Sequence, residues 1–239
     1  MISHQDKCLF VHIPKAAGQS VESVFVNRMG LTWQQREALL LRPNKDPSKG
    51  PPRLAHLTAA EYVSLGYLSQ AQFGQYFTFS FVRNPWARMV SEFRYRRLLG
   101  EPAYQGDFKR FLFTAFPVQN ADNYALGKDY YRHVLPQWQF LYDEKGQCLV
   151  DFVGKFENLQ AEFNQVCHLL NIPEQTLPHK NRKVATGLRQ RFQQKLAQLI
   201  PAFADHRHYS AYYDSESEAF IRQRYQQDIE QFDYTFEQA

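Results

Sequence analysis

The chain has 239 residues, and its 28 lysines and arginines exceed its 24 aspartates and glutamates to give a formal net charge of +4. Apolar residues make up 44% of the sequence and charged residues 22%, which excludes a collagen-like, disordered or coiled-coil protein. This surplus of positive charge is too small to indicate a nucleic-acid partner, although it is compatible with a basic, anion-binding cleft. No step in composition divides the chain, so we expect one domain over residues 1–239.

Three further features predict a soluble, cytoplasmic protein without an integral membrane segment. No apolar run approaches the roughly 18 residues that cross a bilayer. The first seven residues lack the basic and apolar regions of a signal peptide. The three cysteines form no C-x-x-C pair, which argues against a disulfide framework or a thiolate metal site.

The first part of the chain predicts a strand, a tight loop and a helix. Cys8–Ile13 is a short apolar, β-branched run stopped by Pro14, which is typical of a buried strand. Apolar residues then recur at helical spacing after Gly18. The next elements that we expect are a helix over Trp33–Leu41, a loop over Arg42–Arg53, a short run Leu54–His56 and a helix from Thr58 to about Ser64.

The remaining elements repeat the alternation of strands and helices. A second strand, Phe77–Val82, precedes a helix that Asn84 caps and Pro85 starts. Residues 100–136 are aromatic and loop-rich, and form a candidate peripheral subdomain or lid. Further elements are expected at Phe108–Phe116 (helix), Val150–Gly154 (strand), Leu159–Leu170 (helix), Thr186–Leu199 (helix) and Glu216–Phe232 (helix). The order predicts an α/β fold with a central, mostly parallel sheet flanked by helices.

The loop between the first strand and helix has the composition of a phosphate cradle. The segment from Pro14 to Ser20 ends a strand and runs into a helix N-terminus, whose free backbone N–H groups attract anions. Small residues allow close approach, and Lys15 and Ser20 add a cation and a hydroxyl. The lysine precedes the glycine, so this is not a Walker A loop. An ordinary βα turn with a surface lysine is the alternative.

A second anion site is predicted where the second strand ends. Arg83 follows Phe77–Val82 at the carboxyl edge of the expected sheet, where α/β proteins bind their ligands. A Mg²⁺-dependent NTPase would more often place an acid there. Ser91 lies about two helical turns further on, and can meet the same anion if the helix leans across the strand end. The alternative is an Arg83 paired with a carboxylate and a merely solvated Ser91.

Both segments together resemble the signatures of sulfotransferases, most closely the carbohydrate sulfotransferases that include the heparan and dermatan/chondroitin enzymes and bacterial relatives. The resemblance rests on His12–Ser20 and Phe81–Ser91. It continues through Leu135–Gln137, Val153–Leu159, Leu177–Asn181 and the end from Tyr225 to Phe236. It implies a P-loop-like fold, 3′-phosphoadenosine 5′-phosphosulfate (PAPS) as sulfuryl donor, 3′-phosphoadenosine 5′-phosphate (PAP) as product, and no metal.

The resemblance also implies roles for individual residues. The 5′-phosphosulfate would be held by Lys15, Ala16, Ala17, Gly18, Gln19 and Ser20, with Lys15 offsetting charge on the bridging oxygen. Arg83 and Ser91 would hold the 3′-phosphate. Gln19 departs from the family pattern, which has a small hydroxyl residue there. Arg182 and Lys183 fall where relatives close a loop over the donor, although a solvated basic loop is the alternative.

His56 is the candidate general base, because it matches a family position where histidine is common and a neutral imidazole suits proton removal at pH 7. His12, inside the first strand, is expected to be a satisfied core histidine. His206-Arg207-His208 is expected to be a polar loop and not a metal site, since alternation separates the two imidazoles. The helix that follows Arg83 carries the basic residues Arg88, Arg94, Arg96 and Arg97, which are expected to form a solvated face. The alternative is that some of them border the cleft and favour an acidic or already sulfated saccharide.

The sequence thus predicts a PAPS-dependent sulfotransferase acting on a hydroxyl of a carbohydrate or glycoconjugate. Animal relatives carry an N-terminal membrane anchor that this chain lacks, which favours a bacterial cytoplasmic enzyme. Two alternatives remain, a P-loop-type kinase and a catalytically inactive nucleotide- or polysaccharide-binding module. The sequence leaves open the acceptor, the regiochemistry and the oligomeric state.

Overall fold

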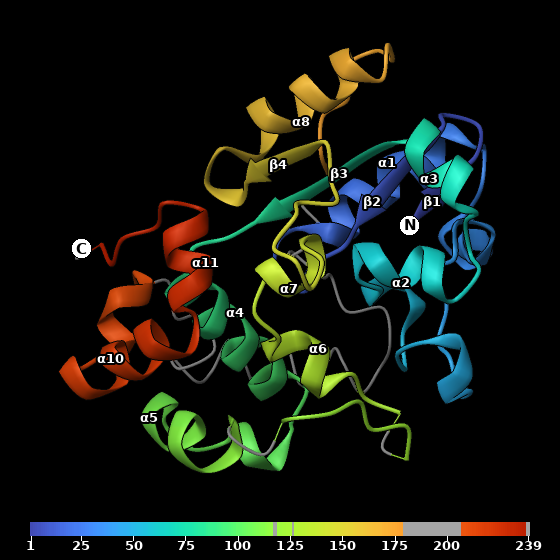
Figure 1. The fold of residues 1–239 in the computed structure, drawn as a ribbon. Helices are drawn as coiled ribbons and strands as arrows, with labels where there is room; N and C mark the ends of the chain where they lie inside the picture. The colour runs from blue at the N-terminus through green and yellow to red at the C-terminus, as the bar shows by residue number, and fades with distance from the viewer. Residues whose placement is uncertain (117–118, 126, 179–206, 238–239) are drawn as a thin grey trace.

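A four-stranded sheet forms the centre of the computed structural model, which describes residues 1–116, 119–125, 127–178 and 207–237 (Figure 1). The strands follow the order β1 (Ile2–Ser3), β2 (Cys8–Val11), β3 (Phe77–Val82) and β4 (Phe152–Lys155). The short β1 pairs antiparallel with β2, whereas β2, β3 and β4 are parallel. The predicted α/β fold with a mostly parallel, helix-flanked sheet is therefore confirmed.

Alternation along the strands directs side chains into two cores. On one face, Phe10 and Phe79 pack with helices α1 (Gly18–Arg28) and α8 (Leu159–Leu169). On the other face, Leu9 lies in a core that includes Tyr62 of α2. Helices on this second face are α2 (Ala59–Ser64), α7 (Trp138–Leu141) and α11 (Gln226–Gln231). Both faces of the sheet are buried, as expected for parallel strands joined by helices.

One glycine of the sheet is required by packing. Gly154 of β4 lies opposite Phe81 of β3 in the register. A Cβ atom at position 154 would lie 2.6 Å from the Phe81 ring. Glycine therefore lets the aromatic side chains of β3 fill the core beside β4.

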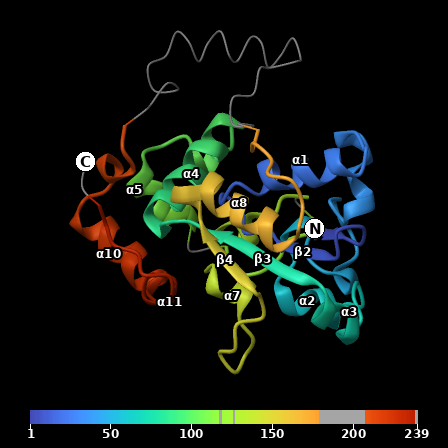
Figure 2. The ribbon, with the colours of Figure 1, turned by 90° about the horizontal axis from the view of Figure 1, so that it is seen from above.

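A third core surrounds α4 (Pro85–Leu98) at one end of the sheet. The Asn84 side chain accepts hydrogen bonds from Trp86 N and Ala87 N, which caps the helix as predicted. Aromatic residues of the 100–116 segment pack beneath α4 together with α10 (Ser215–Arg224). Figures 1 and 2 show α10 beside α4 and α5 (Phe108–Arg110) at this end. These aromatic side chains are thus core residues of the described structure.

Several element boundaries differ from the expected ones. The expected helix at Trp33–Leu41 is a 3₁₀ helix over Trp33–Leu39. The expected helix at Phe108–Phe116 is α-helical only over Phe108–Arg110 and continues as a π-helix over Phe111–Ala115. The expected strand at Val150–Gly154 is shifted to Phe152–Lys155. The expected helix Thr186–Leu199 lies outside the described residues.

The last expected helix, Glu216–Phe232, is wrong as a single element. It is divided into α10 and α11, because Tyr225 leaves the helical conformation with φ of −116° and ψ of 26°. The buried Tyr225 hydroxyl donates to the carbonyl oxygen of Val134 at 2.7 Å, which ties the break to a distant segment. Sequence periodicity carries no signal for such a tertiary contact.

Four short elements were not anticipated, namely β1, α3 (Gln70–Gln75), α6 (Tyr130–Val134) and α7. The run Leu54–His56 forms a single 3₁₀ turn. Within the described part of the chain, no helix combines the length and apolar character needed to cross a membrane.

Candidate active site

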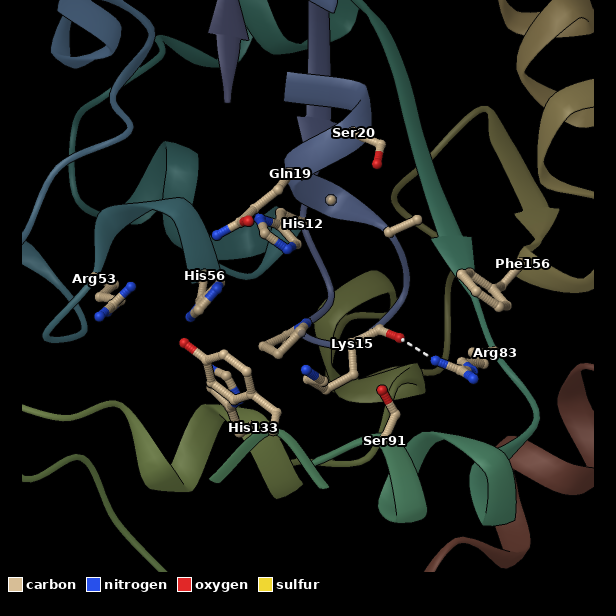
Figure 3. Close-up of a pocket in the computed structure, with 14 residues that line it drawn as sticks. His12, Lys15, Gln19, Ser20, Arg53, His56, Arg83, Ser91, His133 and Phe156 are labelled. Carbon is tan, nitrogen blue, oxygen red and sulfur yellow. Dashed lines mark hydrogen bonds between the residues drawn. The ribbon is translucent and has the colours of Figure 1, made fainter. Parts of the chain in front are cut away.

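A pocket opens where β2 and β3 end, and Figure 3 shows its side chains. The loop after β2, the start of α1, the 3₁₀ turn at residues 54–56, α4 and α6 all contribute to its wall. The lining residues are His12, Pro14, Lys15, Ala17, Gly18, Gln19, Ser20, Arg53, His56, Arg83, Ser91, Tyr95, His133 and Phe156. The structure therefore brings both predicted anion sites and the predicted base into one pocket.

The loop from Pro14 to Ser20 has the geometry of a backbone anion site. We call it the donor loop. Lys15 and Ala17 are left-handed, with φ of 71° and 65°. Such left-handed residues turn successive N–H groups toward one side of a loop, and the 11-residue α1 adds its positive end there. A Cβ atom at Gly18 would lie 2.0 Å from the His12 ring. Glycine is thus required at position 18 by the close approach of His12.

Two residues of the donor loop, Ser20 and Ala16, make contacts within the protein, although the sequence predicts that they face a bound anion. The Ser20 hydroxyl donates to the carbonyl oxygen of Pro178 at 2.8 Å, so it ties the loop to the segment after α8. Ala16 is buried beneath the loop, and its N–H donates to Ile13 O at 3.3 Å. Ala16 therefore does not line the pocket, whereas Lys15, Ala17, Gly18, Gln19 and Ser20 do.

The cations of the two predicted anion sites each lie over an aromatic ring. Lys15 Nζ is 4.0 Å from the ring centroid of Tyr95, and the Arg83 guanidinium carbon is 4.1 Å from that of Phe156. Arg83 Nη1 also donates to the carbonyl oxygen of Lys15 at 3.2 Å, as Figure 3 shows. Rings and backbone therefore hold both cations at the pocket wall.

Arg83 is partly buried, and its hydrogen-bonding capacity is incompletely satisfied. Its Nε atom has no hydrogen-bond partner, and among the described residues no carboxylate lies within ion-pair distance of its guanidinium. Glu157, the acid whose charge acts most strongly on Arg83, accepts instead from Asn84 N and the Tyr234 hydroxyl. Burial lowers the pKa of Arg83 to about 10, so the side chain remains charged at neutral pH. A charged guanidinium at a pocket wall, with a buried Nε that lacks a hydrogen-bond partner, suits an anionic ligand.

Gln137 fixes the backbone of Arg83. Its side chain accepts from Arg83 N and donates to Arg83 O, both at 2.8 Å. Asp228 in turn accepts from Gln137 N and Trp138 N at 2.8 Å each. Neither residue was assigned a role from the sequence, although both lie in segments that carry the family resemblance.

Three buried histidines line the other side of the pocket. His56 lies between His12 and His133, with ring centroids 4.8 Å and 5.2 Å away and both contacts edge-on. Each Nδ1 atom faces a buried carboxylate: His56 pairs with Asp129, His12 with Glu22 at 2.6 Å and His133 with Glu92 at 2.7 Å. Hence His12 is a satisfied core histidine, as expected, but it also belongs to the pocket.

Burial and neighbouring charge set the protonation of the central pair. Burial and then the positive charge of His12 lower the pKa of His56 well below its usual value. Burial raises the pKa of Asp129 to about 6. At pH 7 Asp129 is therefore ionised and His56 neutral. An ionised Asp129 accepts Nδ1–H, which leaves the Nε2 lone pair of His56 available as a base.

The expectation of a solvated basic face on α4 is wrong for Arg88 and Arg96. Arg88 is fully buried and donates to the carbonyl oxygens of Pro14, Leu135 and His133 at 2.9–3.0 Å. Arg96 pairs with Glu92 at 2.6 Å, and the same carboxylate holds His133. These arginines support the pocket wall from behind. Local sequence could not reveal this for Arg88, because its acceptors come from distant segments.

The remaining residues named in the sequence analysis are not all part of the pocket. Arg182 and Lys183 lie outside the described residues. His208 accepts from Ser210 N and contacts the Ser210 hydroxyl at 2.9 Å. Across the described ranges, no three His, Cys, Asp or Glu side chains gather as they would around a metal ion. Sequence reasoning did not place Arg53, Tyr95, His133 and Phe156 in the pocket, because single aromatic and basic residues carry no local signal.

Comparison with known proteins decides the family. The model described as "Sulfotransferase family" matches residues 1–235. The chain belongs to the sulfotransferase family. The fold and the position of the donor loop agree with this assignment, which implies a transferase of sulfuryl groups acting on a hydroxyl-bearing acceptor.

A curated relative gives no further functional information about this sulfotransferase. An uncharacterized protein from Archaeoglobus fulgidus is 27% identical over 103 residues, which cover 43% of this chain and 74% of that protein. No solved structure matches the chain.

Proposed function

We propose that the protein transfers the sulfuryl group of PAPS directly to a hydroxyl of a carbohydrate or glycoconjugate acceptor. The observation that carries this proposal is the pocket that joins the donor loop, Arg83 and His56. Family membership supports sulfuryl transfer, and the pocket residues support the donor and the mechanism that follow.

The chemistry of the pocket fits a donor with two separated anionic ends. The donor loop offers backbone N–H groups and Lys15 at one position. Arg83, with its unpartnered buried Nε, and the hydroxyl of Ser91 offer a second position. In PAPS, the 5′-phosphosulfate would occupy the first and the 3′-phosphate the second. Arg53 lies on the His56 side of the pocket, where the acceptor would enter (Figure 3).

Transfer needs a base, in-line placement and charge stabilisation. His56 Nε2 takes the acceptor hydroxyl proton while the new oxygen–sulfur bond forms. The bond between sulfur and the bridging oxygen breaks, and its electron pair stays on the phosphate of PAP. Lys15 and the loop amides offset that charge, and Asp129 stabilises the imidazolium formed at His56.

The direct test is transfer of labelled sulfate from PAPS to a panel of saccharides, with PAP release measured alongside. We expect turnover by the wild type, and a His56→Ala variant that keeps PAPS affinity but loses most of the rate. A general base contributes roughly 10²- to 10⁴-fold. PAPS binding without turnover on any acceptor, with a His56→Ala variant indistinguishable from wild type, would support the binding-module alternative instead.

A further inference from the structure

His12 is a pocket imidazole that the proposed reaction does not yet use. It follows β2 and precedes the donor loop, and its side chain is buried against Gly18. A Cβ atom placed on Gly18 would be 2.0 Å from both Nε2 and Cδ2 of His12. Since Gly18 is the first residue of α1, the Nε2 edge of the ring lies beside the positive end of the helix. That is where the donor loop would hold the sulfuryl group.

The partner of His12 is a buried carboxylate. Glu22 is buried, and its Oε1 lies 2.6 Å from His12 Nδ1. A buried carboxylate is costly unless a cation pairs with it. Burial would raise the pKa of Glu22, but the charge of His12 and its hydrogen bond outweigh this and the pKa is lowered. An anion bound at Nε2 would place negative charge on both edges of the ring, which stabilises the imidazolium further.

We propose that His12 is a second catalytic imidazole, which Glu22 holds through Nδ1 and which, as an imidazolium, donates its Nε2–H to the sulfuryl oxygens bound at the donor loop. This inference rests on PAPS being the donor. The two adjacent imidazoles then have different tasks. His12 binds the transferring group, and His56 accepts the proton. The two rings meet edge-on, with centroids 4.8 Å apart. The positive charge of His12 also helps to keep His56 neutral.

The third imidazole does not share this position. His133 is equally buried and equally paired with a carboxylate, but its partner Glu92 belongs to α4, where Arg96 holds the same carboxylate. It contacts Tyr95 in a stacked arrangement with centroids 6.2 Å apart. Among the three histidines, His12 is the one packed against the donor loop.

The test compares the affinities of PAPS and PAP without acceptor, by calorimetry, because PAP lacks the sulfuryl group. The variants are His12→Gln and Glu22→Gln, with His168→Gln as matched control. His168 also pairs with a carboxylate, Glu174 at 2.8 Å, but it lies exposed on α8. We expect His12→Gln to weaken PAPS by about ten-fold or more while PAP affinity stays within about two-fold, as for loss of one charge-assisted hydrogen bond.

Glu22→Gln should change the ratio of the two affinities in the same direction while leaving the imidazole in place, and His168→Gln should leave it unchanged. An unchanged ratio in both pocket variants, whether both ligands weaken equally or neither does, overturns the role of His12. Wild-type protein that binds neither ligand overturns PAPS as the donor itself. The two failures are therefore distinguishable.

Discussion

The carboxylate of Asp129 contacts Nδ1 of His56 although 73 positions separate the two residues in the sequence. The contact joins the 3₁₀ turn before α2 to the residue that precedes α6. It gives the candidate base one tautomer, with Nε2 facing the pocket. Asp129 is therefore a positioning residue that the sequence did not reveal.

Asp129 sets the pH dependence that we expect for the rate. As pH falls through about 6, Asp129 takes up a proton and no longer accepts Nδ1–H, whereas His56, with its lowered pKa, is still neutral. The rate should fall on this acid limb. Asp129→Asn should lose rate on the order of 10³-fold and also lose the limb near pH 6. A normal acid limb in this variant would contradict the assignment.

The same pair predicts an opposite effect on stability. The pKa of Asp129 is raised in the folded protein above its unfolded value of 3.8, so its contribution to stability is fully present below about pH 4 and is lost as pH rises through about 6. Asp129→Asn, which stays neutral, should therefore melt no lower than wild type at pH 7. Thermal unfolding at pH 5 and pH 7 measures this. A clearly lower melting temperature of Asp129→Asn at pH 7 would contradict this and show that the hydrogen bond between His56 and ionised Asp129 stabilises the fold.

Arg83 should distinguish ligands by their 3′-phosphate. Arg83→Ala should weaken PAP roughly 10- to 100-fold, the range of one or two charge-assisted hydrogen bonds, and weaken adenosine 5′-phosphosulfate much less. Arg94→Ala is the matched control, since Arg94 belongs to the helix that follows Arg83 but does not line the pocket. Equal weakening of both ligands would remove Arg83 from its proposed position.

The donor loop offers a contrast between neighbouring residues. Ala17 has a left-handed backbone, so Ala17→Gly should relieve strain and raise the free energy of unfolding by about 0.5–1 kcal/mol with PAP affinity kept. Gly18→Ala should abolish tight PAP binding, because its Cβ would overlap the His12 ring. Urea denaturation and calorimetry measure both. A stable Gly18→Ala variant with normal affinity would contradict the packing of His12 on the loop.

Arg88 should stabilise the fold rather than contribute its charge to ligand binding. Arg88→Met leaves three buried carbonyl oxygens without their donor, and we expect a loss of about 3 kcal/mol in the free energy of unfolding. Arg97→Met on the same helix is the control, because Arg97 is partly exposed and lies 5.8 Å from the Phe93 ring. It should change stability by less than about 0.5 kcal/mol. Equal effects would refute the structural role of Arg88.

Sequence patterns predicted the elements that depend on neighbouring residues in the chain. Short-range signals predicted the first buried strand, expected over Cys8–Ile13 and observed over Cys8–Val11, and the second over Phe77–Val82. They also predicted the caps Asn84 and Thr58 and the donor loop. Their position at one sheet edge follows from parallel topology. That residues 1–239 form one cooperative domain stays a prediction.

Contacts between distant segments could not be predicted in this way. The burial of Arg88, the break at Tyr225 and the pairing of Asp129 with His56 depend on partners 45 or more positions away. No periodicity or spacing encodes such a partner. The sequence therefore predicted the loop and the candidate base, but not the residues that hold them in place.

The pocket should bind PAPS and its product PAP in preference to a metal-bound nucleoside triphosphate. Calorimetric titration of the purified protein with PAP, without added metal, measures this, with ATP and Mg²⁺ as the comparison. We expect micromolar PAP binding and little or no ATP affinity. Preference for ATP with Mg²⁺ would rule out PAPS as the donor and favour a phosphoryl-transfer enzyme.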